Sequence, residues 1–149
     1  PVLEELGYNY KLSDSACGIL LAQLRGYEQR LEVRRSLAEY YRESLKEIHF
    51  LKPQVIDQEE NSVLQAFVCI VDERQSRNDL IEWLRDNHIE SQIGTYSSSS
   101  QPIYNVEHNC PVAKVLFEQG IALPLHSSLT KDNIDFIISQ IKRFGDVSR

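Results

Sequence analysis

Apolar residues recur every three or four positions along the first part of the chain. From Ser13 onward they form one stripe, broken only by Arg34: Leu20, Leu24, Tyr27, Leu31, Ala38, Tyr41, Leu45 and Ile48. This spacing places the side chains on one helix face and predicts a long amphipathic helical arm. Ser13 or Asp14 is suited to cap its start by accepting a hydrogen bond from a free amide N–H group. Gly26 is a possible kink or junction between two helices.

Beyond position 50 the pattern changes from helical to short and polar. Lys52-Pro53 and the polar run 57–61 predict a connector, because proline blocks continuation of a helix and the charged run has no apolar face. Residues 63–71, VLQAFVCIV, are rich in β-branched and aromatic types and predict a largely buried strand. Gln65 is its one strongly polar member.

The second half of the chain gives alternating signals for helices and strands. The expected elements are a helix over 77–87 capped by Ser76, a strand over 89–93, a loop marked by Gly94 and the serine run 97–100, a helix over 111–119 that starts at Pro111 and stops at Gly120, a strand over 121–125, and a last helix capped by Thr130. Together with the arm, this order predicts an α+β fold, in which about three strands form a small mixed or antiparallel sheet with helices packed on it.

Composition is that of an ordinary soluble domain, with 42% hydrophobic and 26% charged residues among 149. A formal net charge of −6 argues against nucleic acid as a partner, since binding it requires a basic surface. No apolar run approaches the ~18 residues of a membrane-spanning helix, so no membrane partner is expected. Cys17, Cys69 and Cys110 form no CxxC pair, which favours a reducing, cytoplasmic setting.

Motifs for metal, hydrolytic or nucleotide chemistry are missing from the sequence. The histidines lack the spacing of metal ligands, His126-Ser127-Ser128 has no GxSxG context, and neither GxGxxG nor a P-loop occurs. One segment is singled out instead. Residues 7–14, GYNYKLSD, place an amide, two phenols and an ammonium just before a helix start, where an anion such as phosphate is favoured. The alternative is a turn with Tyr8 and Tyr10 as packing residues.

The segment 7–14 is also the first of several that share one resemblance. The others are 21–24 (LAQL), 34–42 (RRSLAEYYR), 87–89 (NHI), 93–96 (IGTY), 101–104 (QPIY), 110–113 (CPVA) and 123–126 (LPLH). In this order and spacing they resemble the carboxyl-terminal part of the DegT/DnrJ/EryC1/StrS aminotransferases, which are sugar aminotransferases that depend on pyridoxal 5'-phosphate (PLP). The resemblance covers nearly the whole chain.

The resemblance implies an activity, a cofactor and site residues. Enzymes of this family transfer an amino group from glutamate or glutamine to a keto group on a nucleotide-linked sugar, and they work as homodimers. Asn9 matches the asparagine that reaches the cofactor phosphate of the other subunit. Lys11 stands where arginine is usual and keeps the charge without the bidentate fork. The residues that the resemblance assigns to the substrate pocket are Tyr10, Thr95, Tyr96, Gln101 and Tyr104.

The same resemblance predicts the domain organisation. The lysine that binds PLP in this family belongs to a large amino-terminal domain with no counterpart here, and the chain contains no methionine. We therefore expect residues 1–149 to be a single carboxyl-terminal domain of a larger protein, with 1–50 as helical arm and interface segment and 61–145 as the α+β module. Alone it is expected to be inactive, with no catalytic residue and no metal ligand.

Departures from the family pattern leave alternatives open. Gln65 stands where a histidine is usual, and Thr95-Tyr96-Ser97 stands where His-Tyr-Pro is usual. Serine hydroxyls can donate hydrogen bonds to a sugar but do not titrate near neutral pH. An unusual substrate is one reading, and a non-catalytic regulatory or interaction protein of the same fold is another. A free-standing small α+β binding module is the third.

Overall fold

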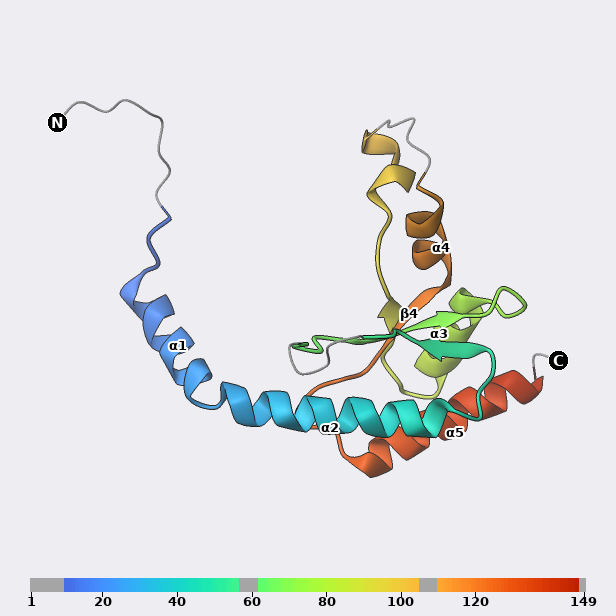
Figure 1. Ribbon diagram of the computed structural model, residues 1–149, viewed down its shortest axis with the longest axis horizontal. Coiled ribbons are helices and arrows are strands. Elements are labelled where there is room, and N and C mark those ends of the chain that lie inside the picture. The colour runs from blue at the N-terminus through green and yellow to red at the C-terminus, as the bar shows by residue number, and fades with distance from the viewer. Residues whose placement is uncertain (1–9, 57–61, 105–109, 148–149) are drawn as a thin grey trace.

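The computed structural model describes residues 10–56, 62–104 and 110–147. Its helices are α1 (Asp14–Arg25), α2 (Tyr27–Leu45), α3 (Arg77–Asp86), α4 (Pro111–Gln119) and α5 (Lys131–Val147); its strands are β1 (Leu51–Pro53), β2 (Phe67–Val71), β3 (Gln92–Ile93) and β4 (Gly120–Leu123); and two 3-10 turns, η2 (Ser98–Ser100) and η3 (Pro102–Tyr104), lie between β3 and α4. The arrangement confirms the predicted α+β class (Figure 1).

The sheet is antiparallel throughout, with strand order β1-β2-β4-β3. It has one strand more than predicted, because Leu51–Pro53, taken from the sequence as a connector, pairs with β2 as an edge strand. Leu51 is 2% exposed and supplies the buried side chain that the prediction overlooked. Pro53 is compatible with this place because an edge strand leaves one side of its backbone unpaired.

The other strands are shorter than their apolar runs. β2 begins at Phe67 rather than Val63, and Leu64 adopts a positive φ of 43°, which is incompatible with an extended strand. β3 is limited to Gln92–Ile93, and β4 ends at Leu123, just before Pro124, which has no N–H to donate to a ladder. Apolar composition therefore marked the strands correctly but overestimated their length.

The helical arm is two helices that meet at Gly26. Ser13 caps α1, its Oγ accepting a hydrogen bond from the Ala16 N–H at 3.3 Å. The predicted stripe is buried only from Leu31 onward, through most of α2 to Ile48 just after it. No residue of α1 is buried. Figure 1 shows the reason: α2 lies along α5 against the body of the molecule, whereas α1 projects away from it.

The core lies between the sheet and the helices α2, α3 and α5. Tyr41 is fully buried at its centre: its ring stacks on Phe67 with centroids 4.7 Å apart, and its hydroxyl donates a hydrogen bond to the Pro124 carbonyl at 3.1 Å. Burial raises the pKa of this phenol, so it stays protonated and serves as a donor. On the α3–α5 side, the Trp83 indole N–H donates to the Gln140 carbonyl at 3.0 Å.

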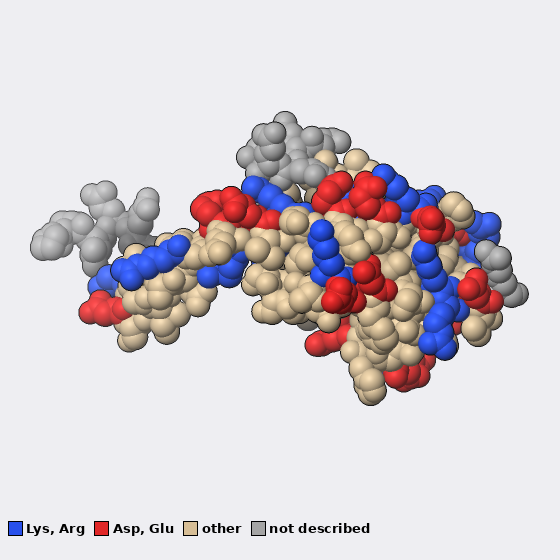
Figure 2. Space-filling view, turned by 90° about the horizontal axis from the view of Figure 1, so that it is seen from below, with Lys and Arg blue, Asp and Glu red and all other residues tan. Residues whose placement is uncertain are grey.

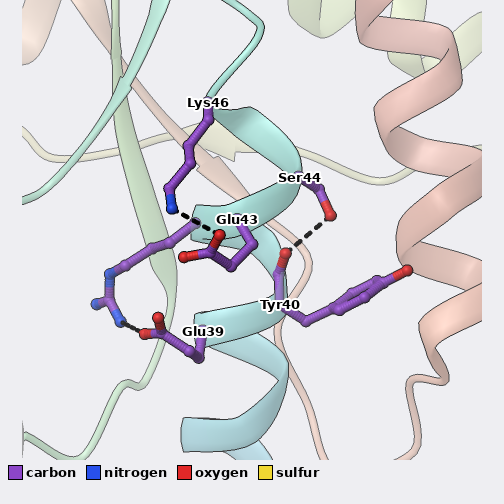
Figure 3. A network of polar contacts seen from close by, with 6 residues as sticks. Glu39, Tyr40, Glu43, Ser44 and Lys46 are labelled. Carbon is purple, nitrogen blue, oxygen red and sulfur yellow. Dashed lines mark hydrogen bonds and ion pairs between the residues drawn. The ribbon is translucent and has the colours of Figure 1, made fainter.

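The outer side of α2 is held by local polar contacts. Glu39 pairs with Arg42 at 3.4 Å and Glu43 with Lys46 at 2.6 Å, in the i, i+3 arrangement that neighbours on a helix surface allow (Figure 3). The Tyr40 side chain points toward α5, where its hydroxyl donates to an Asp135 carboxylate oxygen at 2.7 Å. The Tyr40–Asp135 hydrogen bond joins α2 to α5. The caps predicted at Ser76 and Thr130 are confirmed.

Removing the Tyr41 hydroxyl should lower the stability of the chain measurably. We expect Tyr41→Phe to reduce the free energy of unfolding by about 1 kcal/mol, because the buried Pro124 carbonyl loses its donor, and Tyr41→Ala to reduce it by about 3–5 kcal/mol. Urea unfolding followed by Trp83 fluorescence measures both. Tyr104→Phe, at an exposed tyrosine, is the control and should stay within about 0.5 kcal/mol of the parent. Equal stability of Tyr41→Phe and the parent would contradict the role of this hydrogen bond.

Candidate functional site

Of the two predicted cofactor-phosphate residues, Lys11 lies at the outer end of the arm. Asn9 falls outside the described residues, so its geometry is not part of the structure. Tyr10 and Lys11 come just before α1, and both side chains are exposed, Tyr10 to 85%. In the space-filling view the arm stands clear of the body (Figure 2). The exposed ammonium of Lys11 therefore belongs to a part of the chain that projects from the body.

The predicted substrate residues Thr95, Tyr96, Gln101 and Tyr104 share one segment between β3 and α4. This segment is more ordered than the plain loop predicted from its serines, because η2 and η3 fold it around Ser97, which is 1% exposed. The Ser97 hydroxyl accepts a hydrogen bond from Ser100 Oγ at 2.9 Å and lies 3.0 Å from Ser99 Oγ. Gln101 Nε2 donates to the Ser97 carbonyl at 3.3 Å.

The aromatic members of this segment are turned outward. Tyr96 is 71% exposed and Tyr104 is 61% exposed. The Tyr96 ring lies 5.8 Å from the Phe117 ring, which joins the segment to α4. Figure 1 shows α4 and the 3-10 turns rising together from the sheet, on the side away from α2 and α5. Hydroxyl, amide and aromatic groups are thus displayed at the end of a projection, a set suited to hydrogen bonding and stacking with a sugar nucleotide.

Among the described residues, the predicted site residues before α1, Tyr10 and Lys11, do not meet those of the segment 95–104 within one chain. Lys11 precedes α1 at one end of the molecule, whereas Tyr104 lies on the separate projection beside α4 (Figure 1). Neither group lines an enclosed pocket in the described residues. A single site that uses both groups therefore requires surfaces beyond those of one copy of this chain.

Arg77 is a residue that the sequence analysis missed. It opens α3 and is 8% exposed, and its Nη1 donates a hydrogen bond to the Gly120 carbonyl at 2.8 Å. Its Nε donates to Asn78 Oδ1 at 2.8 Å. Burial lowers the pKa of the guanidinium. An arginine in the first turn of a helix is usually solvated, so the sequence did not predict this buried contact.

An open groove of about 530 Å³ lies between the β3–β4 end of the sheet and the start of α5. Gln65, His88 and His126 are among its lining residues, and none of the predicted site residues is. In the described parts of the chain, no cluster of His, Cys, Asp or Glu side chains is arranged to hold a metal ion. The described helices include none that is long and apolar enough to cross a membrane.

The buried cysteine does not form a reactive site either. Cys69 is fully buried in β2, and burial raises the pKa of its thiol to about 12. The thiol therefore stays protonated at neutral pH and packs as a small apolar group.

The residues present do not amount to a complete PLP site. Every lysine of the chain is exposed to solvent, so none is enclosed in the kind of pocket that surrounds a lysine bound to PLP. Lys11 fits only the anionic phosphate end of the cofactor. A complete site would need residues from outside this chain.

Comparison with known proteins identifies the family. Residues 2–142 match the model of the DegT/DnrJ/EryC1/StrS aminotransferase family, and the chain belongs to this family. It is 27% identical over 149 residues to the GDP-perosamine synthase of Vibrio cholerae, covering 93% of this chain and 39% of that protein. It is 27% identical over 143 residues to the dTDP-4-amino-4,6-dideoxy-D-glucose transaminase of Shigella dysenteriae, covering 92% of this chain and 39% of the relative.

Solved structures give the same fold. The aminotransferase TlmJ from Streptoalloteichus hindustanus superposes with a TM-score of 0.88 at 20% identity, over 99% of this chain and 40% of that one. The chain thus spans about two fifths of the length of the proteins it resembles. The sequence-based recognition of the family is confirmed.

The exposed apolar side chains of α1 predict self-association of the 149-residue chain. Four apolar side chains of α1 have exposed fractions of 47–65%: Ile19, Leu20, Leu21 and Leu24. Exposing such apolar surface to water is unfavourable in free energy. Sedimentation velocity should show species larger than a monomer, and the double variant Leu20→Glu, Leu24→Glu should shift them toward the monomer.

A control variant with the same added charge separates the role of α1 from a general effect of charge. Val55→Glu with Val63→Glu changes two exposed valines outside α1 and should leave the association unchanged. A monomeric parent chain that binds no apolar dye would contradict the prediction.

Proposed function

We propose that this chain is the carboxyl-terminal domain of a PLP-dependent aminotransferase that acts on a nucleotide-linked keto sugar. The intact protein would work as a homodimer in the cytoplasm, with glutamate or glutamine as amino donor. The observation that carries the proposal is the family match over residues 2–142. The chain spans about two fifths of the length of its relatives. We therefore propose that it supplies part of the active site and has no activity alone.

The first share is contact between subunits. α1 has no buried residue, and its apolar side chains are in water in the isolated chain. Covering them with another part of the dimer would recover hydrophobic free energy of about 25 cal/mol for each Å² removed from water. This contact would also carry the start of α1 to the neighbouring subunit.

The second share is the phosphate end of the cofactor. Asn9 would donate its side-chain amide, and Lys11 its ammonium, to the phosphate of PLP held by the other subunit. PLP, when bound, supplies the electron sink for amino-group transfer. The lysine that holds it would come from the large domain, since every lysine here is exposed.

The third share is the substrate pocket. Thr95 and Gln101 would hydrogen-bond to the sugar or the diphosphate, while Tyr96, Tyr104 and Tyr10 would offer aromatic faces to the sugar or the base. The names of two relatives, a GDP-perosamine synthase and a transaminase for a dTDP-linked 4-amino sugar, support a nucleotide sugar as the substrate class, and the second name supports a keto group at C4.

One observation favours a second candidate function. The segment 94–104 contains no histidine, and its one buried serine, Ser97, bonds to the hydroxyls of neighbouring serines. Such a segment can bind a ligand without taking part in proton transfer. A non-catalytic regulatory or interaction protein of the same fold would fit this arrangement.

An absorbance spectrum separates the two functions. The protein made from its complete reading frame and purified with PLP should show the visible band of bound cofactor, and glutamate should replace that band with one at shorter wavelength. The same test with a panel of GDP-, dTDP- and UDP-linked 4-keto sugars should then restore the visible band. A protein without a cofactor band would support the regulatory function.

The proposed contact of Asn9 has its own test in the complete protein. We expect Asn9→Ala to weaken PLP retention by about 1.5–3 kcal/mol, the value of one hydrogen bond to a charged group. Equilibrium dialysis against PLP measures this change. Gln29→Ala, at an exposed position on α2, is the matched amide control and should bind PLP as the parent does. Equal affinity in Asn9→Ala and Gln29→Ala would remove Asn9 from the site.

A further inference from the structure

Two buried polar side chains, Arg77 and Ser97, are associated with the segment that carries the proposed substrate residues. Among the described residues, the buried polar or charged ones are Arg77, Ser97 and Gln140. Ser97 lies within the segment 95–119, and Arg77 bonds to the residue that follows it. Burying a polar group costs free energy unless its hydrogen bonds are replaced, and a buried charge costs more. No carboxylate in the described ranges pairs with Arg77. Burying Arg77 without a paired carboxylate therefore costs folding free energy.

Both ends of the segment 95–119 meet at one oxygen atom. The Gly120 carbonyl accepts a hydrogen bond from the Gly94 N–H at 2.9 Å and another from Arg77 Nη1 at 2.8 Å. Gly94 immediately precedes the segment and Gly120 immediately follows it. A carbonyl oxygen has two lone pairs, and here both have partners. Arg77 thus holds the point where the projecting segment leaves the sheet and returns to it.

The two glycines allow a close crossing that no other residue would permit. A Cβ atom on Gly94 would lie 2.9 Å from Val68 Cγ1 and 3.0 Å from the Gly120 carbonyl carbon. A Cβ atom on Gly120 would collide with the Leu116 carbonyl oxygen. The backbones are therefore in direct contact, and the guanidinium of Arg77 is the side-chain group that fixes their common acceptor.

The segment itself is tied together internally. Tyr96 contacts Phe117 of α4, and the hydrogen bonds around Ser97 hold η2. A small tilt at the Gly94–Gly120 crossing would consequently displace the described residues 95–104 and α4 together, Tyr104 among them.

We propose that Arg77 is a positioning residue for the nucleotide sugar: it holds the Gly120 carbonyl, and through it the segment with Thr95, Tyr96, Gln101 and Tyr104, in the orientation that binds the substrate. This inference rests on the proposed function, because it assigns the substrate to that segment. Arg77 touches neither substrate nor cofactor. Its loss should weaken sugar binding and leave the reaction with glutamate intact.

The test uses the protein from the complete reading frame with Arg77→Met and Arg77→Lys. The probe is the 4-keto sugar nucleotide that the parent turns over fastest among GDP-, dTDP- and UDP-linked forms. We expect Arg77→Met to raise KM for this sugar about tenfold, with kcat and the rate of the glutamate half-reaction within about twofold of the parent. Arg77→Lys keeps a donor and should recover part of the loss. Arg85→Met, at an exposed arginine in the last turn of α3, is the matched control and should behave as the parent.

Hydrogen–deuterium exchange gives a second readout that needs no substrate. In Arg77→Met, amides of described residues within 95–119 should exchange faster, while those of α2 and α5 should be unchanged. An unchanged KM, or equal losses in both half-reactions, would overturn the positioning role, and so would unchanged exchange in the segment. A parent protein without a PLP band refutes the proposed function instead, and the exchange experiment then still decides whether Arg77 holds the segment.

Discussion

The packing of α2 against the sheet is the constraint on which the rest of the structure depends. Tyr41 fills the centre of this contact, stacked on Phe67 and bonded to the Pro124 carbonyl, so one side chain joins α2, β2 and the turn after β4. With α2 fixed in the core, the chain before Gly26 has no surface left to pack on. α1 therefore projects with its apolar side chains in water, which makes it available to another part of a larger assembly.

A second constraint acts where the segment between β3 and β4 leaves the sheet and returns to it. Backbone contact at Gly94 and Gly120 brings the two ends of the projecting segment together. Arg77 and the Gly94 N–H both donate to the Gly120 carbonyl oxygen. The side chains that the proposed function assigns to the substrate lie on this projecting segment, just as Lys11 lies before the start of α1. In the proposed function the core supplies rigidity and the projections bind the ligands, which is the usual division between a scaffold and the segments that bind.

This division explains why the chain fits a shared site better than a site of its own. Its one buried thiol is protonated, its lysines are exposed, and the predicted contacts lie on two separate projections. The two curated relatives are more than twice as long as this chain, and the proposed function assigns both projections to contacts with a larger domain or a second subunit. The proposed aminotransferase function makes use of both.

Local signals in the sequence determined the helices, their caps at Ser13, Ser76 and Thr130, the break at Gly26 and the α+β class, because these depend on side-chain spacing and on hydrogen bonds within a few residues. The family was also readable from the order of short segments. The tertiary structure alone decided that Leu51–Pro53 is an edge strand, that the stripe of α1 stays exposed, and that Arg77 is buried against Gly120. Each of these depends on a partner far away in the sequence, and hydrophobic periodicity carries no information about which distant surface a residue will meet.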